Sequence, residues 1–337
     1  MTPAPAPAEF AARVSPWRRR ETGLLLTLLL LVAGVSLLRP DFLSLQNFRD
    51  ILQNAATPAL VAAGMTAVIV AGGIDISVGS MLAVCAVVGA LAAKQGWGLP
   101  AVAGVAVAAG LVMGAFNGFL VATLRIPSIV ATLATLGGFR GGLHWVTRGY
   151  TVSGLPESLG RLGSAYWPGG HGRWFALPAP VWLAGIGIAV TALALGRTRA
   201  GRWLYAVGGG PRAATLSGIA VGRAQALTFV ALGGLVGLGA FLRLTRLAQV
   251  QPAFGSGFEL QVITAVVVGG TDIFGGRGTV LGSVLGALIV AVISPALVYL
   301  EQHTHLGSEV QPAIQGLLIL AVVLVDHWRR RAELADE

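Results

Sequence analysis

Residues 72–80 read GGIDISVGS, and residues 269–277 repeat much of that pattern as GGTDIFGGR. Each stretch follows an apolar run that begins with Thr-Ala-Val, and each precedes a second apolar run that ends in Gly-Ala-Leu. One shift of 197 residues maps four positions of the first copy onto the second: Gly72, Asp75, Gly79 and Gly89. A shared shift of this kind indicates an internal duplication, which is common in membrane transporters.

The composition favours a membrane protein. Of the 337 residues, 55% are hydrophobic and 11% are charged, and the mean hydropathy is +0.77. Soluble domains carry about 25% charged residues, so we predict an all-α polytopic membrane protein. Glycine is frequent, at 48 residues, and small residues let helices approach closely in lipid. Glycines four residues apart, the spacing that favours close helix packing, are Gly110/Gly114/Gly118, Gly233/Gly237 and Gly282/Gly286.

Apolar runs of spanning length predict about ten transmembrane helices in two internally related halves. The predicted runs lie near 24–38, 55–72, 78–93, 99–122, 127–146, 178–196, 225–242, 258–270, 279–300 and 313–325. No small-residue cleavage site follows the first run, so we interpret it as a retained helix. Residues 1–20 are predicted to be a disordered cytoplasmic tail, residues 21–326 the transmembrane domain, and residues 327–337 a cytoplasmic C-terminal tail.

Basic residues predict the orientation of these helices. With the N-terminus inside, 14 basic residues fall on the inner side and 8 on the outer side, as the positive-inside rule requires. Both termini are then cytoplasmic. Residues 150–177 form an outer loop rich in Gly, Trp and Pro, which favours an interfacial loop or a short surface helix. Residues 197–224 form an inner loop with five arginines.

The sequence lacks the motif of a phosphate-binding loop. That loop needs a Gly-Lys-Ser/Thr end, but the only lysine, Lys94, stands between Ala93 and Gln95. We therefore predict that this chain binds no cofactor and that any ATP is bound by another chain. The net charge of +9 lies mainly at the ends of apolar runs, so it favours membrane orientation over nucleic-acid binding.

Neither cysteine nor histidine predicts a metal site. The single cysteine, Cys85, excludes an intrachain disulfide. His303 and His305 lie near Glu301 and Glu309 in a predicted outer loop, where solvated side chains explain the same pattern as a metal site would. We predict no metal site.

The inner loop carries the pattern of a short helix. Pro211 suits the first helical position and Gly218 the residue just past the end. Between them lie about two turns, roughly 10 Å long: Arg212, Ala213, Ala214, Thr215, Leu216 and Ser217. So short a helix cannot bury its own apolar side, so we predict that Ala213, Ala214 and Leu216 pack into a partner's groove. A solvated basic loop is the alternative.

Several motifs resemble those of ABC importer permeases of the ribose/xylose/arabinose type, which are related to branched-chain amino acid permeases. The motifs are RAGRWLYAVGGGPRAATLSGI at 199–219, GGIDISVGS at 72–80, Asn117-Gly118 followed by IPSIVATL at 126–133, and the segment 269–282. The resemblance extends over about residues 45–325. The family usually has an acidic residue where Arg212 stands and a basic one where Thr215 stands. This departure implies a matched change in the partner or a different mode of engagement.

The resemblance implies a permease subunit in the bacterial plasma (inner) membrane that has no catalytic residues. Its partners would be a second permease subunit in a homo- or heterodimer, two cytoplasmic ATPase subunits that hold ATP and magnesium, an extracytoplasmic substrate-binding protein, and membrane lipid. Residues Pro211–Gly218 would couple the permease to the ATPase. The substrate stays open among ribose, another pentose, rhamnose and a furanose-like signal molecule.

Four ionisable residues lie at or near membrane depth: Asp75, Arg140, Glu259 and Asp272. A central Asp or Arg costs about 2.5–3.5 kcal/mol to insert, while a Leu returns only about 0.3–0.6, so these residues lie at helix ends or face a pathway. We interpret Arg140 as a partner for a carboxylate or for backbone carbonyls. Glu259 follows a turn that is either on the outer side or re-entrant.

The paired stretches predict matching helix breaks at cytoplasmic turns. The residues assigned to the breaks or to the translocation pathway are Gly72, Gly73, Asp75, Ser77, Gly79, Asn117 and Asp272. Asp75 either anchors a broken helix, together with Ser77, or contacts sugar hydroxyls directly. Further candidates for a sugar-binding lining are Asn54, Thr57, Ser128, Thr132 and Thr135.

Two other functions are compatible with parts of the sequence. An aspartyl intramembrane protease would use the two symmetry-related aspartates, but both copies read GGxD whereas such proteases resemble GxGD at one site. An ATP-independent secondary transporter or channel would also show duplication and broken helices. The short helix predicted in the inner loop distinguishes an ABC permease from such a transporter, because a transporter that works without ATP presents no helix to an ATPase.

Overall fold

The structure, a computed structural model, describes residues 16–168, 176–304, 310–318 and 320, and most of them are helical. The main helices are α1 (Pro16–Leu38), α2 (Leu45–Val70), α3 (Val78–Lys94), α4 (Leu99–Gly118), α5 (Ser128–Thr147), α6 (Glu157–Gly163), α7 (Ala179–Arg197), α8 (Arg199–Gly209), α9 (Pro211–Leu216), α10 (Val221–Leu244), α11 (Phe258–Val268) and α12 (Val280–Thr304). A 3-10 turn, η1 (Pro40–Leu43), precedes α2, and a π-helical turn, η2 (Phe119–Thr123), extends α4. The prediction of an all-α polytopic membrane protein is confirmed.

Six of the described helices are long and apolar enough to cross a membrane: α1, α2, α4, α7, α10 and α12. The helix α5 has 20 residues, while α3 and α11 are apolar but shorter. The predicted count of ten is therefore approximate. Residues 319 and 321–325 of the last predicted run, together with His305 and Glu309 of the predicted outer loop, lie outside the described residues.

The predicted start of α2 was wrong by ten residues. The sequence predicts a run from residue 55, but the helix begins at Leu45, where the Ser44 hydroxyl accepts a hydrogen bond from the Asn47 amide (3.3 Å). The first turns of α2 contain several polar residues, so their mean hydropathy is too low to indicate a membrane-spanning run. The cap, which a hydropathy window does not register, marks the true start of the helix.

Helix α2 is the centre of the bundle and contacts α7, α10, α11 and α12. Around it, glycines bring pairs of helices into backbone contact. A Cβ atom on Gly110 of α4 would overlap the carbonyl oxygen of Gly233 in α10, and a Cβ on Gly286 of α12 would overlap that of Ala265 in α11. The predicted role of the spaced glycines in close packing is confirmed.

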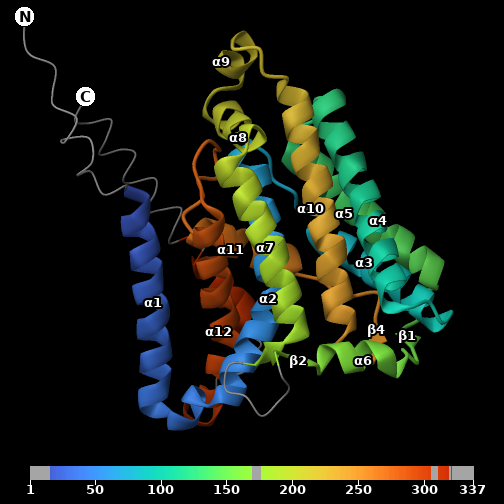
Figure 1. The fold of residues 1–337 in the computed structure, drawn as a ribbon, viewed down its shortest axis with the longest axis vertical. Helices are drawn as coiled ribbons and strands as arrows, with labels where there is room; N and C mark the ends of the chain where they lie inside the picture. The colour runs from blue at the N-terminus through green and yellow to red at the C-terminus, as the bar shows by residue number, and fades with distance from the viewer. Residues whose placement is uncertain (1–15, 169–175, 305–309, 319, 321–337) are drawn as a thin grey trace, which may run out of the picture.

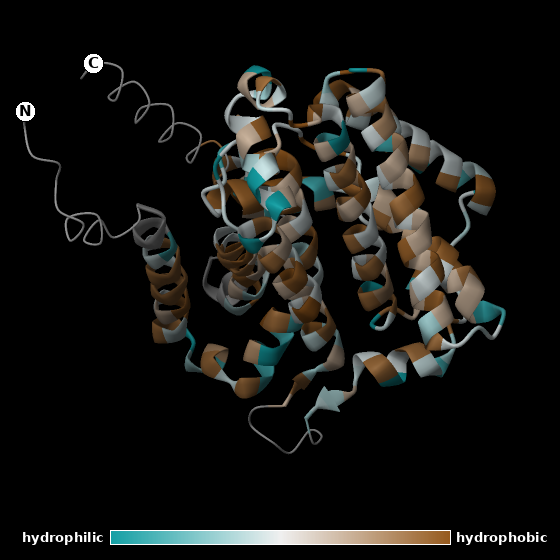
Figure 2. Cartoon of the chain, turned by 45° about the horizontal axis from the view of Figure 1, so that its top comes forward, coloured by the Kyte–Doolittle hydropathy of each residue, from teal (hydrophilic) through white to brown (hydrophobic). Residues whose placement is uncertain are grey.

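The two ends of the bundle differ. Helices α8 and α9 lie at one end, and α6 lies at the other with two short strand pairs, β1 (Val152–Ser153) with β4 (Gln249–Val250) and β2 (Tyr166–Trp167) with β3 (Leu177–Pro178). Helix α6 lies in the segment 150–177, where the sequence predicts an interfacial loop or a short surface helix, and so agrees with the second of these. Apolar residues follow the lengths of the helices, and polar residues gather toward their ends (Figure 2).

Candidate functional site at the paired helix breaks

The two duplicated stretches end their helices in the same way. Helix α2 ends where Gly72 adopts the left-handed conformation (φ 82°), with its amide donating to the Ile69 carbonyl (2.8 Å) and the Gly73 amide donating to that of Val68 (2.9 Å). This is a Schellman motif, in which a glycine without a Cβ satisfies the last carbonyls of the helix.

Helix α11 ends in a second Schellman motif. Gly270 has φ 84°, its amide donates to the Val267 carbonyl (2.9 Å), and the Thr271 amide donates to that of Val266 (3.2 Å). The predicted internal duplication is therefore visible in the backbone as well as in the sequence.

Each break then turns around its aspartate. Asp75 Oδ1 accepts from the Ser77 amide (2.8 Å), and Asp272 Oδ1 accepts from the Phe274 amide (2.9 Å). One residue fewer separates the left-handed glycine from the aspartate in the second copy. The two aspartates thus occupy equivalent local structures, each engaged by its own loop.

The first break is held by a buried polar cluster. Asp75 is fully buried, and its carboxylate also accepts hydrogen bonds from the Ser77 hydroxyl (2.6 Å) and from Asn117 Nδ2 (2.9 Å). Asn117, at the end of α4, donates in addition to Ser77 Oγ (2.8 Å). The structure therefore brings the predicted site residue Asn117 to Asp75 and Ser77, which are about 40 residues away in the sequence. In this conformation their geometry is that of an anchor.

Two further helices hold the same break. The Ile74 amide donates to Ser128 Oγ of α5 (3.1 Å), and Thr132 Oγ1 donates to the Ile74 carbonyl (3.3 Å). From α10, Gln225 Nε2 donates to the Ala71 carbonyl (3.1 Å). The first break is thus fixed to α4, α5 and α10 at once.

The two breaks meet at a cluster of glycines that includes α8. The Gly276 amide of the second break donates to the Val70 carbonyl at the end of α2 (2.9 Å). A Cβ on Gly208 of α8 would overlap both of those groups, and a Cβ on Gly275 would lie 3.1 Å from Gly72 Cα. We name Gly72, Gly208, Gly275 and Gly276 the glycine junction. The pairing of the two breaks and the part played by Gly208 were not predicted from the sequence.

Helix α8 also contacts the second break through a side chain. Tyr205 Oη donates to the Gly278 carbonyl (2.8 Å), and burial raises the pKa of the Tyr205 hydroxyl. At its start, α8 is capped by Thr198 Oγ1, which accepts from the Gly201 amide (3.1 Å). The sequence predicted neither contact.

The predicted short helix is present as α9. It begins at Pro211, and Gly218 past its end is left-handed (φ 81°). Ala214 is only 3% exposed, because it packs against Val207 and Ala224 within the same chain. Leu216, by contrast, is 90% exposed. The prediction that Ala214 faces a partner is therefore wrong, because Ala214 holds α9 to the bundle; Ala213 and Leu216 are exposed.

The segment before α11 reaches the start of α3 at Gly79. A Cβ on Gly79 would meet the Gly255 carbonyl oxygen at 2.5 Å and would overlap the Glu259 carboxylate. Because α3 rises about 1.5 Å per residue, Gly79 lies about 22 Å below the far end of that helix. Arg140 Nη1 donates to the carbonyls of Pro252 (2.8 Å) and Phe254 (2.6 Å), and so pairs the carbonyls of an irregular segment. The interpretation of Arg140 as a carbonyl partner is confirmed.

Most of the other candidate sugar contacts are engaged in helix packing. Asn54 Oδ1 accepts from Arg246 Nη1 (2.7 Å), and Thr57 Oγ1 donates to the Gly239 carbonyl (3.4 Å). Thr135 is buried and donates to the carbonyl of Thr132 within α5 (3.2 Å).

A bundle whose described residues include six helices long and apolar enough to cross a membrane defines a multi-pass membrane protein. The chain belongs to the family described as branched-chain amino acid transport system / permease component, which matches residues 47–325.

Several curated proteins are similar to this chain over nearly its whole length. The ribose import permease protein RbsC of Escherichia coli (strain K12) is 39% identical over 309 residues, which are 91% of this chain and 93% of that protein. RbsC of Haemophilus influenzae is 36% identical over 90% and 92% of the two chains. The autoinducer 2 import system permease protein LsrC of Yersinia pestis (strain Pestoides F) is 35% identical over 91% and 84%. No solved structure matches.

Proposed function

We propose that this chain is the membrane-spanning permease subunit of an ATP-driven ABC importer for a simple sugar or a furanose-like signal molecule. The observation that carries the proposal is the similarity, over nine-tenths of the chain, to permeases that import ribose. The chain is also similar to autoinducer 2 permeases over the same length. The candidate substrates are therefore ribose, another pentose, rhamnose and a furanose-like signal molecule. The chain carries no covalent chemistry and sits in a bacterial plasma membrane with both termini cytoplasmic.

The proposed assembly contains a second permease subunit, two ATPase subunits with ATP and magnesium, and an extracytoplasmic binding protein. The segment Pro211–Gly218, which contains α9, docks on the ATPase. Its exposed Leu216 supports this role, since an isolated leucine that is 90% exposed on a helix held against the bundle is suited to a partner's pocket.

Movement of the ATPase reaches the bundle through α9 and α8. Helix α9 is fixed to α8 and α10 by Ala214, and α8 is fixed to both helix breaks at the glycine junction. Backbone groups in contact transmit displacement directly, because no flexible side chain lies between them to absorb it. The breaks are the points where the spanning helices change direction.

The experiment is reconstitution of the permease with its ATPase and binding protein in proteoliposomes, with labelled ribose, xylose and rhamnose as probes. We expect uptake that needs both ATP and the binding protein. Leu216→Asp should abolish uptake and ATPase co-purification. Leu43→Asp, an exposed leucine at the opposite end of the molecule, is the control and should change neither.

Two outcomes would overturn the proposal. One is uptake driven by an ion gradient with no ATPase present, which would make the protein a secondary transporter. The other is full ATPase co-purification by the Leu216→Asp variant, which would remove α9 as the docking segment.

A further inference from the structure

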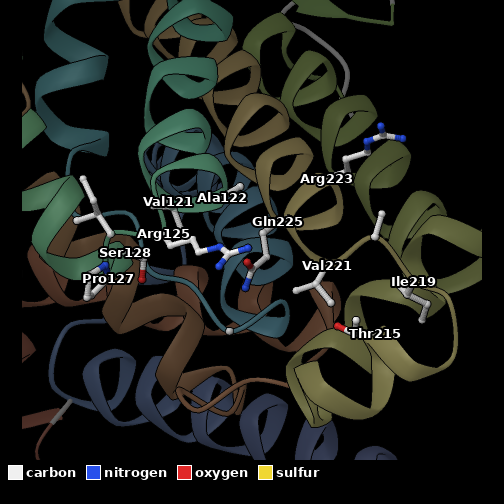
Figure 3. A pocket seen from close by; sticks show the side chains of 14 residues that line it. Val121, Ala122, Arg125, Pro127, Ser128, Thr215, Ile219, Val221, Arg223 and Gln225 are labelled. Carbon is white, nitrogen blue, oxygen red and sulfur yellow. The ribbon is translucent and has the colours of Figure 1, made fainter.

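A cavity of about 680 Å³ opens beside the first helix break. It lies between Gly72 of that break, the start of α5 at Ser128, Thr215 of α9 and the start of α10 at Val221 (Figure 3). Its size is in the range of small-molecule sites, which are about 300–1,000 Å³. The cavity is at the end of the bundle that carries α8 and α9, which is the cytoplasmic end in the proposed orientation.

The lining favours an anion. Arg125 extends its guanidinium into the cavity toward Gln225 (Figure 3). Of the described residues that line the cavity, none is acidic, so no carboxylate there neutralises this charge. Two long helices, α5 and α10, also begin at the lining, and the first amides of a helix have no acceptor within it. Their positive dipole ends add to the charge of Arg125.

The backbone at Arg125 is unusual for an arginine. Its φ is 57°, in the left-handed region where a residue with a Cβ is disfavoured and glycine is the common choice. The arginine side chain nevertheless stands at this position, at the junction of η2 and α5.

Polar groups beside Arg125 can recognise hydroxyls. Gln225 donates its Nε2 to the Ala71 carbonyl (3.1 Å), which leaves its side-chain oxygen as an acceptor. Ser128 Oγ accepts from the Ile74 amide (3.1 Å), which leaves its hydroxyl hydrogen to donate. A guanidinium flanked by an amide oxygen and a hydroxyl suits a phosphate attached to a polyol.

We propose that this cavity binds a phosphate ester, either a free sugar phosphate or the headgroup of an anionic phospholipid. The bound phosphate would contact Arg125 and the starts of α5 and α10, and the polyol would face Gln225 and Ser128. Such a ligand touches the first break and the α9–α10 segment together. Its binding therefore opposes any movement of one relative to the other.

The test is calorimetric titration of the purified permease alone, in nanodiscs of phosphatidylcholine, with ribose 5-phosphate, inorganic phosphate and ribose. We expect the two phosphates to bind and ribose not to bind. Arg125→Gln should weaken the binding at least about tenfold, as expected from losing a hydrogen bond to a charged group. Arg223→Gln is the matched control: it removes the same charge at the same cavity, but its side chain points away from Arg125 and Gln225 (Figure 3). It should leave the affinity unchanged.

A second variant keeps Arg125 in place. Thr215→Glu adds a carboxylate at the exposed rim of the cavity and should also abolish phosphate binding. Nanodiscs with phosphatidylglycerol identify the source of the ligand. If this lipid competes with ribose 5-phosphate, the site takes a lipid headgroup; if it does not, the site takes the free ester. Both results support the site.

Three results would overturn the inference. They are the absence of phosphate binding in phosphatidylcholine, equal losses in the Arg125→Gln and Arg223→Gln variants, and phosphate binding that survives Thr215→Glu. Displacement of phosphate by added ATPase, together with loss of ATPase co-purification in Arg125→Gln, would also overturn it, because the cavity would then be a protein contact. Since the titration uses the permease alone, its outcome is independent of the transport assay.

Discussion

The glycine junction makes Gly208 a position of α8 where a side chain is not tolerated. A Cβ atom there would overlap the Val70 carbonyl and the Gly276 amide, which are hydrogen-bonded to each other at 2.9 Å. Both obstacles are backbone, so no side chain can rotate away. Since non-bonded carbon contacts are optimal at about 3.5–4.0 Å, α8 or the second break would have to move by more than about 1 Å.

The expected cost of Gly208→Ala follows from these contacts. Overpacking costs about 1–3 kcal/mol, and loss of the hydrogen bond between the two breaks adds about 0.5–1.5 kcal/mol. We therefore expect a loss of about 2–4 kcal/mol in the free energy of unfolding. Because the strain lies between α8 and both breaks, uptake per folded molecule should fall as well.

The adjacent glycine is the matched control. An added Cβ on Gly209 meets nothing within 4 Å, and alanine is the better helix former by about 1 kcal/mol. Thermal unfolding followed by size-exclusion chromatography should show a clearly lower melting temperature for Gly208→Ala than for the unmodified protein. Gly209→Ala should not lower the melting temperature. Equal melting temperatures and equal ATP-dependent uptake in the two variants would refute the reasoning.

Three further predictions concern single side chains. Asn117→Leu removes the Nδ2 group that donates to buried Asp75. It should lower the free energy of unfolding by about 1.5–3 kcal/mol, measured by thermal unfolding. The control Asn54→Leu changes a more exposed residue and should lower the free energy of unfolding less. Arg140→Met leaves the Pro252 and Phe254 carbonyls without their donor, so a cysteine placed at Ser256 should react faster with a thiol reagent, whereas buried Cys85 gives little background. Ala214→Asp should loosen α9 and speed tryptic cleavage after Arg212, while Ala213→Asp, on the exposed side, should not; equal cleavage rates would show that Ala214 does not hold the helix.

Features governed by local chemistry were predictable from the sequence. The bounds of α9 follow from Pro211 and Gly218, because a missing amide and a left-handed turn act within the helix itself. The helix ends at Gly72 and Gly270 are local for the same reason. The start of α2 was missed because its first turns are polar, although the Ser44 cap is readable in the sequence.

Contacts between distant segments were not predictable. Asp75 and Asn117 were each selected as site residues, but nothing in their spacing shows that a turn and the end of α4 meet. Gly208 belongs to a run of three glycines, and only the packing against Val70 shows that its lack of a side chain is required while that of Gly209 is not. The cavity at Arg125 depends likewise on two helix starts coming together.

The described contacts that hold the two copies of the duplicated break come from different helices. The first is fixed by buried hydrogen bonds to α4, α5 and α10, through Asn117, Ser128 and Gln225. The second is bound to α8 through Tyr205 and to the end of α2 through the Gly276 amide. A displacement of α8 acts on both breaks, and breaking the cluster of the first would leave a buried carboxylate without donors. The two copies of the duplication meet at the glycine junction, where α8 contacts both of them.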